Sequence, residues 1–206
     1  MNPGIHKTGL LTMKSETVYY LPGHGGRLET GLGEALMSRG FNVAGRQTIG
    51  DFKAIPFSDQ IAIIAEDLTN NYWREGARVI ANSFGAYLFL NALTLMKPYI
   101  GKVLLLSPIV GEFSNEDIRM GFIPPHSGRL AQNAENGTYP TPLHCEIHVG
   151  ELDWQSNPAN VTKLAELLGL SATVVPSGGH MLDKQYVSAV LDRWLAPCTA
   201  DKLAPA

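Results

Sequence analysis

The sequence is poor in charge and in cysteine, and it has no long hydrophobic run. Only 17% of its 206 residues are charged, the net charge is −3, and no run of Lys and Arg is present that could bind phosphates. Nucleic acid is therefore not expected as a partner. The two cysteines, Cys145 and Cys198, lie far apart and outside any C-x-x-C pattern, so they indicate neither a metal site nor a disulfide framework.

Membrane-crossing and secretory segments are also missing. Apolar stretches such as residues 103–106 are far shorter than the roughly 20 residues that span a bilayer. Residues 1–14 contain no apolar segment of signal-peptide length. We therefore expect a cytoplasmic protein without a membrane partner. The length fits a single domain over residues 1–206, and the sequence leaves the oligomeric state open.

Short apolar runs alternate with amphipathic stretches along the chain, which is typical of an α/β fold with a mostly parallel sheet covered by helices on both faces. Strands are predicted over residues 18–21, 41–44, 77–81, 102–107, 145–149 and 172–175. Helices are predicted over residues 28–38, 58–73, 84–96, 158–168 and 184–195. Residues 111–143 break this rhythm with several Pro, Gly and Asn, and we interpret them as an insertion that folds over the strand ends.

Ser83 stands where a predicted strand ends and a predicted helix begins at Phe84. A sharp turn at this point projects the hydroxyl above the sheet and places the first free N–H groups of the helix beside it. Residues 81–85, Ala-Asn-Ser-Phe-Gly, resemble the G-x-S-x-G nucleophile elbow of the α/β-hydrolase family and depart from it only at Ala81. Alone, this pentapeptide is equally compatible with a polar turn that ends a strand.

A nucleophilic serine needs a base, and four histidines follow Ser83 in the sequence. His144 and His148 flank a predicted strand, which favours structural roles, and His126 lies in the insertion, where it could contact substrate. His180 lies in a glycine-containing loop after the last predicted strand, where ligands and chemistry sit in parallel sheets. The resemblance implies the order Ser, acid, His along the chain, which makes His180 the predicted base.

The acid that orients the base is expected in the loop after residues 145–149. Asp153 fits the position that the resemblance implies for it, and Glu151 in the same loop is the competing carboxylate. A solvated turn residue is the alternative interpretation of Asp153.

When a serine attacks a carbonyl group, the carbonyl oxygen becomes negatively charged, and two N–H donors are needed to stabilise this oxyanion. One is expected from Phe84 and the other from the loop at residues 22–27, which resembles the family's oxyanion loop. By position we predict Gly26 as the second donor, with Gly25 as the next choice, and we interpret His24 as a residue that holds the loop. The glycine spacing in this loop fits neither of the common nucleotide-binding motifs.

The resemblance implies an α/β-hydrolase fold with a mostly parallel sheet of about six strands, residues 41–44 at or near one edge, and a lid over residues 111–143. It also implies a serine hydrolase of carboxylesterase or thioesterase type, which would cleave a small ester or thioester through an acyl-enzyme without metal or cofactor. A small-molecule acyl substrate is then the expected partner. Residues expected to line its pocket, or else to pack around it, are Asn82, Phe113, Phe122, His126, Trp154 and Met181.

Other functions use the same set of residues. A member of the fold could bind a small ligand without catalysis, although an intact triad argues against this. Acyl transfer to an acceptor other than water and hydrolysis of a carbon–carbon bond also remain alternatives.

Overall fold

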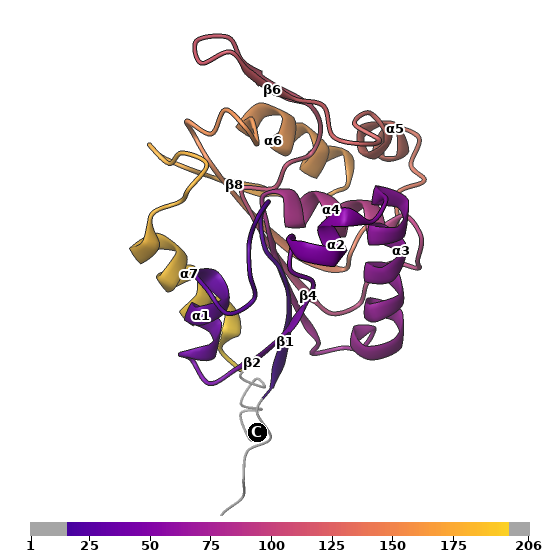
Figure 1. Cartoon of the computed structure of the whole chain (residues 1–206), viewed down its shortest axis with the longest axis vertical. Helices are drawn as coiled ribbons and strands as arrows, with labels where there is room; N and C mark the ends of the chain where they lie inside the picture. The colour runs from indigo at the N-terminus through magenta and orange to yellow at the C-terminus, as the bar shows by residue number, and fades with distance from the viewer. Residues whose placement is uncertain (1–15, 198–206) are drawn as a thin grey trace, which may run out of the picture.

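The computed structural model describes residues 16–197, and its centre is a six-stranded sheet (Figure 1). The strand order is β2-β1-β3-β4-β7-β8, and every neighbouring pair is parallel. The strands are β1 (Thr17–Leu21), β2 (Asn42–Gly45), β3 (Arg78–Asn82), β4 (Lys102–Leu106), β7 (His144–Gly150) and β8 (Ala172–Val175). The predicted parallel sheet is thus confirmed, and the strand expected at an edge is the edge strand β2.

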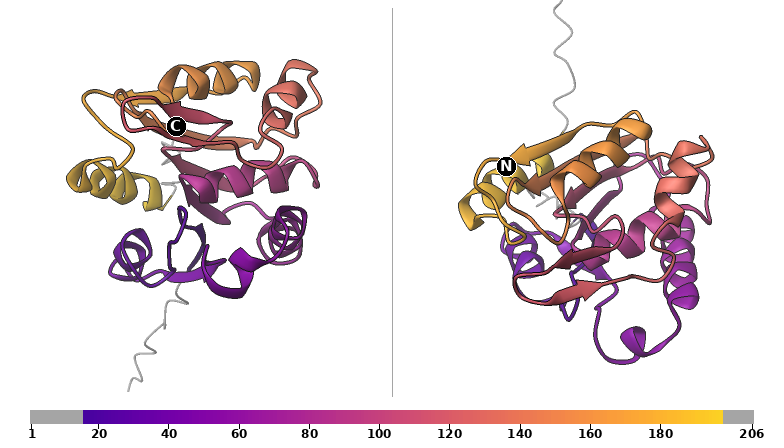
Figure 2. Two further views of the ribbon diagram at one scale, coloured as in Figure 1. Left: turned by 45° about the horizontal axis from the view of Figure 1, so that its top comes forward. Right: turned by 90° about the horizontal axis from the view of Figure 1, so that it is seen from above.

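Helices cover both faces of the sheet (Figure 1, Figure 2). On one face, α1 (Leu32–Met37) and α7 (Lys184–Leu195) pack against the strands through a cluster that includes Leu36 and Leu191. On the other face lie α3 (Phe57–Asp67), α4 (Phe84–Leu93) and α6 (Pro158–Leu167). The remaining helical elements are α2 (Gly50–Ala54), the π-helical turn η1 (Leu68–Tyr72) and α5 (Arg129–Glu135).

The helix starts follow from local capping. The side chain of Asn157 accepts hydrogen bonds from two N–H groups at the start of α6, and Asp183 does the same for α7. Helix α1 is shorter than its predicted range because Gly31, with a φ of 57°, takes the left-handed conformation and delays the helix until Leu32. Short helix α2 has too few residues to produce a helical period in the sequence.

Residues 111–143 are more regular than the sequence suggests. They contain α5 and an antiparallel hairpin of β5 (Phe113–Asn115) and β6 (Met120–Phe122), which projects from the body in Figure 1. Two tyrosines fix this insertion to the domain: the Tyr87 hydroxyl donates to the Pro125 carbonyl at 2.7 Å, and the Tyr139 hydroxyl donates to the Leu90 carbonyl at 2.8 Å. Whether the insertion acts as a lid stays a prediction.

One of the two cysteines lies outside the described residues. Cys198 is outside them, and Cys145 is a free thiol in β7. Within residues 16–197, no helix is long and apolar enough to cross a membrane.

Candidate active site

Ser83 occupies a strained turn between β3 and α4. Its φ of 53° and ψ of −123° are unusual for a residue other than glycine, and such a conformation costs about 1–3 kcal/mol and persists only where the surroundings hold it. The Ser83 N–H donates to the Leu106 carbonyl at 3.0 Å, which ties the turn to β4. A Cβ atom at Gly85 would lie 2.2 Å from the carbonyl oxygen of Leu21, so only glycine fits two residues after the serine. The Ala81 methyl is fully buried in β3, and the turn accommodates it.

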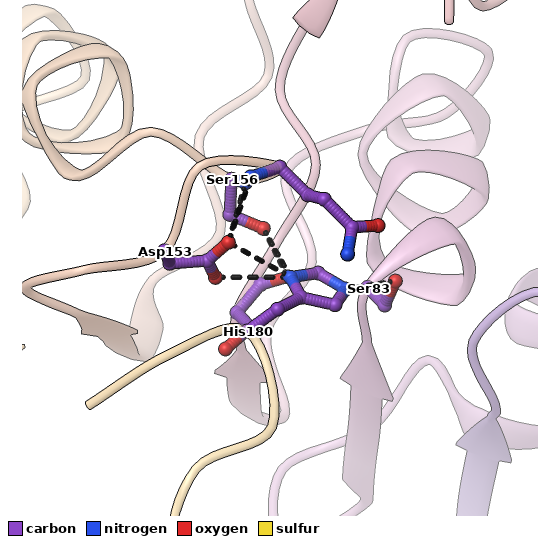
Figure 3. Close-up of polar contacts among 6 residues, drawn as sticks. Ser83, Asp153, Ser156 and His180 are labelled. Carbon is purple, nitrogen blue, oxygen red and sulfur yellow. Dashed lines mark hydrogen bonds and ion pairs between the residues drawn. The ribbon is translucent and has the colours of Figure 1, made fainter. Parts of the chain in front are cut away.

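Ser83, His180 and Asp153 lie in a continuous chain of hydrogen bonds (Figure 3). The Ser83 Oγ is 2.8 Å from the His180 Nε2. The His180 Nδ1 is 3.0 Å from each carboxylate oxygen of Asp153. With its proton on Nδ1, the imidazole donates to Asp153 and accepts from the serine hydroxyl, which is the arrangement that general-base activation requires.

Asp153, and not Glu151, is the carboxylate that reaches the histidine. Glu151 is exposed, and its side chain accepts a hydrogen bond of 2.8 Å from the Ser177 N–H. The acid loop and the histidine loop meet through their main chains, because a Cβ atom at Gly150 would lie 2.3 Å from the carbonyl oxygen of Gly178. The Leu152 N–H also donates to that carbonyl at 2.7 Å. These main-chain contacts set the distance between the two side chains.

The surroundings of Asp153 favour its charged form. Burial of this carboxylate, which is 1% exposed, opposes ionisation. The hydrogen bond with His180 and the N–H groups of Ser156 and Gln155, at 2.9 and 3.0 Å, outweigh burial and hold the pKa of Asp153 below its usual value. A carboxylate that remains ionised can stabilise an imidazolium beside it.

Ser156 belongs to this cluster, although sequence reasoning missed it. Its hydroxyl donates to the Ser107 carbonyl at 2.7 Å, and the same oxygen lies 3.4 Å from the His180 Nδ1 (Figure 3). The side chain is almost fully buried. An Asp side chain often accepts hydrogen bonds from the N–H groups two and three residues later in a turn. This pattern could have indicated the contact between Asp153 and the Ser156 N–H, but it carries no signal for the contacts of the Ser156 hydroxyl.

The glycine-rich loop after β1 lies beside the serine. A Cβ atom at Gly23 would be 3.1 Å from the Ser83 Cβ. The Gly26 N–H, predicted as the second oxyanion donor, already donates to the Gly23 carbonyl at 2.9 Å and to the Thr48 Oγ1 at 3.0 Å. The prediction for Gly26 therefore conflicts with the hydrogen bonds of the loop.

Thr48 holds this loop, a role that the sequence had assigned to His24. Besides accepting from Gly26, its hydroxyl donates to the Gly23 carbonyl. The His24 ring is exposed and contacts the Phe84 ring edge-on, with centroids 6.1 Å apart. Among the hydrogen bonds within residues 16–197, none uses the N–H of His24, Gly25 or Phe84, so these donors are available to a ligand.

A cavity of about 710 Å³ opens on Ser83 and His180 and extends between α1 and α7. We call it the α1–α7 cavity; Leu32 and Ala35 of α1 and Val187 and Leu191 of α7 line its walls. Its volume lies within the range of small-molecule sites. Two of the predicted pocket residues, Asn82 and Met181, line it. Asn82 is oriented by the Tyr20 hydroxyl, which donates to its Oδ1 at 2.9 Å.

Four other predicted pocket residues pack elsewhere. Ring centroids of Phe113 lie 5.6 Å from those of both Phe122 and Trp154, and the Phe122 centroid lies 6.0 Å from that of Phe84. The His126 ring meets Phe57 edge-on at 5.3 Å. The described lining of the α1–α7 cavity includes none of Phe113, Phe122, His126 and Trp154. Aromatic pairing thus joins the hairpin to the body, and contact of these four residues with a substrate stays a prediction.

The remaining histidines lie away from Ser83. His148 is buried, with its ring nitrogens 2.7 Å from the Tyr186 hydroxyl and 2.7 Å from the Glu146 carboxylate, and His144 is exposed at the start of β7. The buried, hydrogen-bonded setting of His148 fits the structural role that the sequence favours for it. Across residues 16–197, no group of three or more His, Cys, Asp and Glu side chains could hold a metal ion.

Comparison with known proteins rests on structure. No protein-family model matches the sequence, and no curated protein matches it. The YdeN gene product of B. subtilis is 14% identical with a TM-score of 0.61, and the match covers 89% of this chain and 100% of that one. A monoacylglycerol lipase of Paleococcus ferrophilus is 15% identical with a TM-score of 0.59, over 87% and 93% of the two chains. A proposed hydrolase of the α/β superfamily from Xanthomonas campestris pv. campestris is 16% identical with a TM-score of 0.55, over 87% and 98%.

The chain has the α/β-hydrolase fold. In this α/β-hydrolase fold, Ser83 follows β3, Asp153 follows β7 and His180 follows β8. The chain order of the three residues is therefore the order typical of the fold.

Proposed function

We propose that this chain is a serine hydrolase that cleaves a small ester or thioester, with Ser83 as nucleophile, His180 as base and Asp153 as the orienting acid. The observation that carries the proposal is the pair of contacts at His180: 2.8 Å to the Ser83 Oγ and 3.0 Å to both oxygens of a buried carboxylate. A buried Ser–His–Asp chain at the mouth of a cavity suits acyl transfer.

In the first half of the reaction, the Ser83 Oγ attacks the carbonyl carbon of the substrate while His180 takes the hydroxyl proton. The carbon–oxygen or carbon–sulfur bond to the leaving group then breaks, and His180 donates the proton to the departing alcohol or thiol. Asp153 keeps the proton of the other ring nitrogen in place and stabilises the imidazolium. The result is an ester between Ser83 and the acyl group.

In the second half, water replaces the leaving group. His180 takes a proton from water as it attacks the acyl-enzyme, and then returns that proton to the Ser83 oxygen as the carboxylic acid leaves. Every proton in this scheme is carried by His180, so the side chains and amides of this chain account for each step. The monoacylglycerol lipase among the similar structures supports acyl-ester chemistry on this fold.

The negative oxygen of each tetrahedral intermediate needs two donors. We assign the Phe84 N–H as one, as the sequence predicts, because it begins α4 directly after the nucleophile. The second assignment moves from Gly26 to His24, since the Gly26 N–H is occupied and His24 follows Gly23, which packs against Ser83. Gly25 is the neighbouring donor on the same loop.

A labelling experiment tests the proposal. The purified protein is treated with a fluorophosphonate probe, and the labelled peptide is identified by mass spectrometry; turnover of nitrophenyl esters and matching thioesters is then measured. We expect one label on Ser83 and loss of both label and turnover in Ser83→Ala. Ser114→Ala, which changes a serine of the hairpin, is the matched control and should keep both. Equal labelling of Ser83→Ala, or a wild type that neither reacts nor turns over, would overturn the proposal.

A further inference from the structure

The walls of the α1–α7 cavity are apolar and incompletely covered. Four aliphatic side chains pack against the core on this face of the sheet, yet each is only partly buried. They are Leu32 and Ala35 on α1, Leu182 in the loop before α7, and Val187 on α7. Their remaining surface faces the cavity that opens on Ser83. Hydrocarbon placed there would remove this apolar surface from water, which is favourable.

Arg39, just after α1, lines the cavity, and its charge is paired with a carboxylate of α7. The Arg39 Nε donates to the Asp192 carboxylate at 2.7 Å, its Nη2 donates to the Ser188 Oγ at 2.6 Å, and its Nη1 donates to the Ala35 carbonyl at 2.8 Å. The guanidinium therefore bridges α1 and α7 and is neutralised by α7. A substrate carboxylate would have to compete with Asp192 for it.

The charges near the cavity mouth are mixed in sign. Arg27, Glu34 and Lys184 line it, and the Arg27 side chain lies 3.9 Å from the Glu29 carboxylate. Arg27 and Lys184 are opposed by Glu34 and by Glu29, and all four side chains are exposed to solvent. Their combined field is weak and does not select a charged ligand. The cavity is thus suited to an uncharged chain.

On the other side of Ser83, aromatic rings pack against one another. Phe84 lies next to the serine, and its ring is covered by Phe122 of β6, with centroids 6.0 Å apart. Phe113 in turn joins the hairpin to Trp154 of the acid loop. Opening this side would break several ring contacts, whereas the α1–α7 cavity is already open.

We infer that the α1–α7 cavity is the acyl-chain site and that the substrate is an ester or thioester of an unbranched, uncharged fatty acid whose length is limited by the Arg39 bridge. This inference rests on the proposed function and specifies its substrate class. Each methylene buried between the helices should raise kcat/KM about fourfold, until the chain reaches Arg39.

The test is an acyl-length profile of nitrophenyl esters, from acetate to dodecanoate, compared among variants. Ala35→Phe and Val187→Phe each fill the cavity and should lower the ratio of octanoate to acetate kcat/KM at least tenfold. Ala189→Phe is the matched control because it adds the same ring to an exposed position of α7, and it should leave the profile unchanged. Arg39→Met removes the bridge and should move the optimum to longer chains.

A binding measurement separates this inference from the proposed function. The Ser83→Ala protein is titrated with cis-parinaric acid, a fluorescent fatty acid, with and without Ala35→Phe. We expect binding that weakens at least tenfold with Ala35→Phe. If esters are hydrolysed but neither filling variant changes the profile, or if Phe122→Ala changes it instead, the chain lies elsewhere and the inference is wrong. If no ester is hydrolysed yet Ala35-dependent binding persists, the hydrolase proposal fails and the apolar site stands.

Discussion

Ser83 has two different sides. Toward α1 and α7 it opens on a cavity of about 710 Å³ with aliphatic walls. Toward the hairpin of β5 and β6 it meets a group of aromatic rings whose centroids lie 5.6–6.0 Å apart. The first side has an open cavity, and the second has specific contacts between aromatic rings.

This difference shows how residue type can mislead about a pocket. Large aromatic residues beside a nucleophile suggest a binding surface, yet here Phe113 and Phe122 join the insertion to the acid loop through Trp154. The open walls come from Leu32, Ala35 and Val187, which belong to ordinary amphipathic helices. The aromatic rings connect the hairpin to the acid loop, and the aliphatic side is the one on which we place the substrate.

The largest expected loss of activity comes from changing the proposed triad of Ser83, His180 and Asp153, which lies between the aliphatic and the aromatic side. Asp153→Asn should lower kcat about 10⁴-fold, because an amide favours the wrong tautomer of His180. Initial rates with nitrophenyl acetate measure this. Glu151→Gln, a change of carboxylate to amide in the same loop but away from the histidine, should cost less than tenfold. The reverse ranking would make Glu151 the acid.

Ser156→Ala should have a smaller effect at the same centre. The change removes the hydroxyl that donates to the Ser107 carbonyl and contacts His180, a loss of about 1 kcal/mol, so kcat should fall roughly fivefold. If Ser156 positions His180, the pH dependence of kcat should also move, and Ser156→Thr should restore part of the rate. A fall in melting temperature with an unchanged kcat and pH profile would reduce Ser156 to a structural residue.

Phe122→Ala tests the aromatic side directly. The substitution removes ring contacts with Phe84 and Phe113, each worth about 0.5–1.5 kcal/mol, and should lower the free energy of unfolding by about 1–2 kcal/mol. Because we place the acyl chain in the α1–α7 cavity, the ratio of kcat/KM between long and short esters should stay within about twofold of wild type. Chemical unfolding and the ester profile, measured on the same preparation, decide between packing and binding.

The difference in stability between the wild type and Asp153→Asn should depend on pH. The pKa of Asp153 is lowered by folding, so its contribution to stability is present above the unfolded value of about 3.9 and is lost as the pH falls through the folded value. The stability difference between wild type and Asp153→Asn should therefore be largest near pH 7 and narrow below about pH 4. Urea unfolding at the two pH values measures it, and a difference that stays constant would contradict the assigned cause of the shift.

Local signals were enough to predict the sheet and most of the triad. Short apolar runs ended by Gly, Pro or Asn marked all six strands, because buried parallel strands carry apolar residues on both faces. Ser83 was predicted because it stands directly after such a run, and His180 because it lies in the loop after the last one, where the family resemblance places the base. Gly85 was required by the turn, and its contact with the Leu21 carbonyl explains why.

The rest depends on distances that no local pattern contains. Thr48 reaches the glycine loop from a segment far along the chain, and its hydrogen bond with Gly26 removes the predicted oxyanion donor. The Ser156 hydroxyl finds its partner at Ser107, after a different strand. The α1–α7 cavity is lined by two helices from opposite ends of the chain, which pack on the same face of the sheet.

The contact between Gly150 and Gly178 has a consequence for how this molecule can change. Main chain meets main chain there, so the spacing of Asp153 and His180 does not depend on the size of any side chain in α1 or α7. The cavity walls can therefore be exchanged while the reacting groups stay in register. In a library of random variants, replacements of Ala35 and Val187 should change the substrate preference, whereas almost no replacement of Gly150 should leave an active protein. Selectivity for the substrate can therefore change by substitution in the cavity walls without a loss of the reacting geometry.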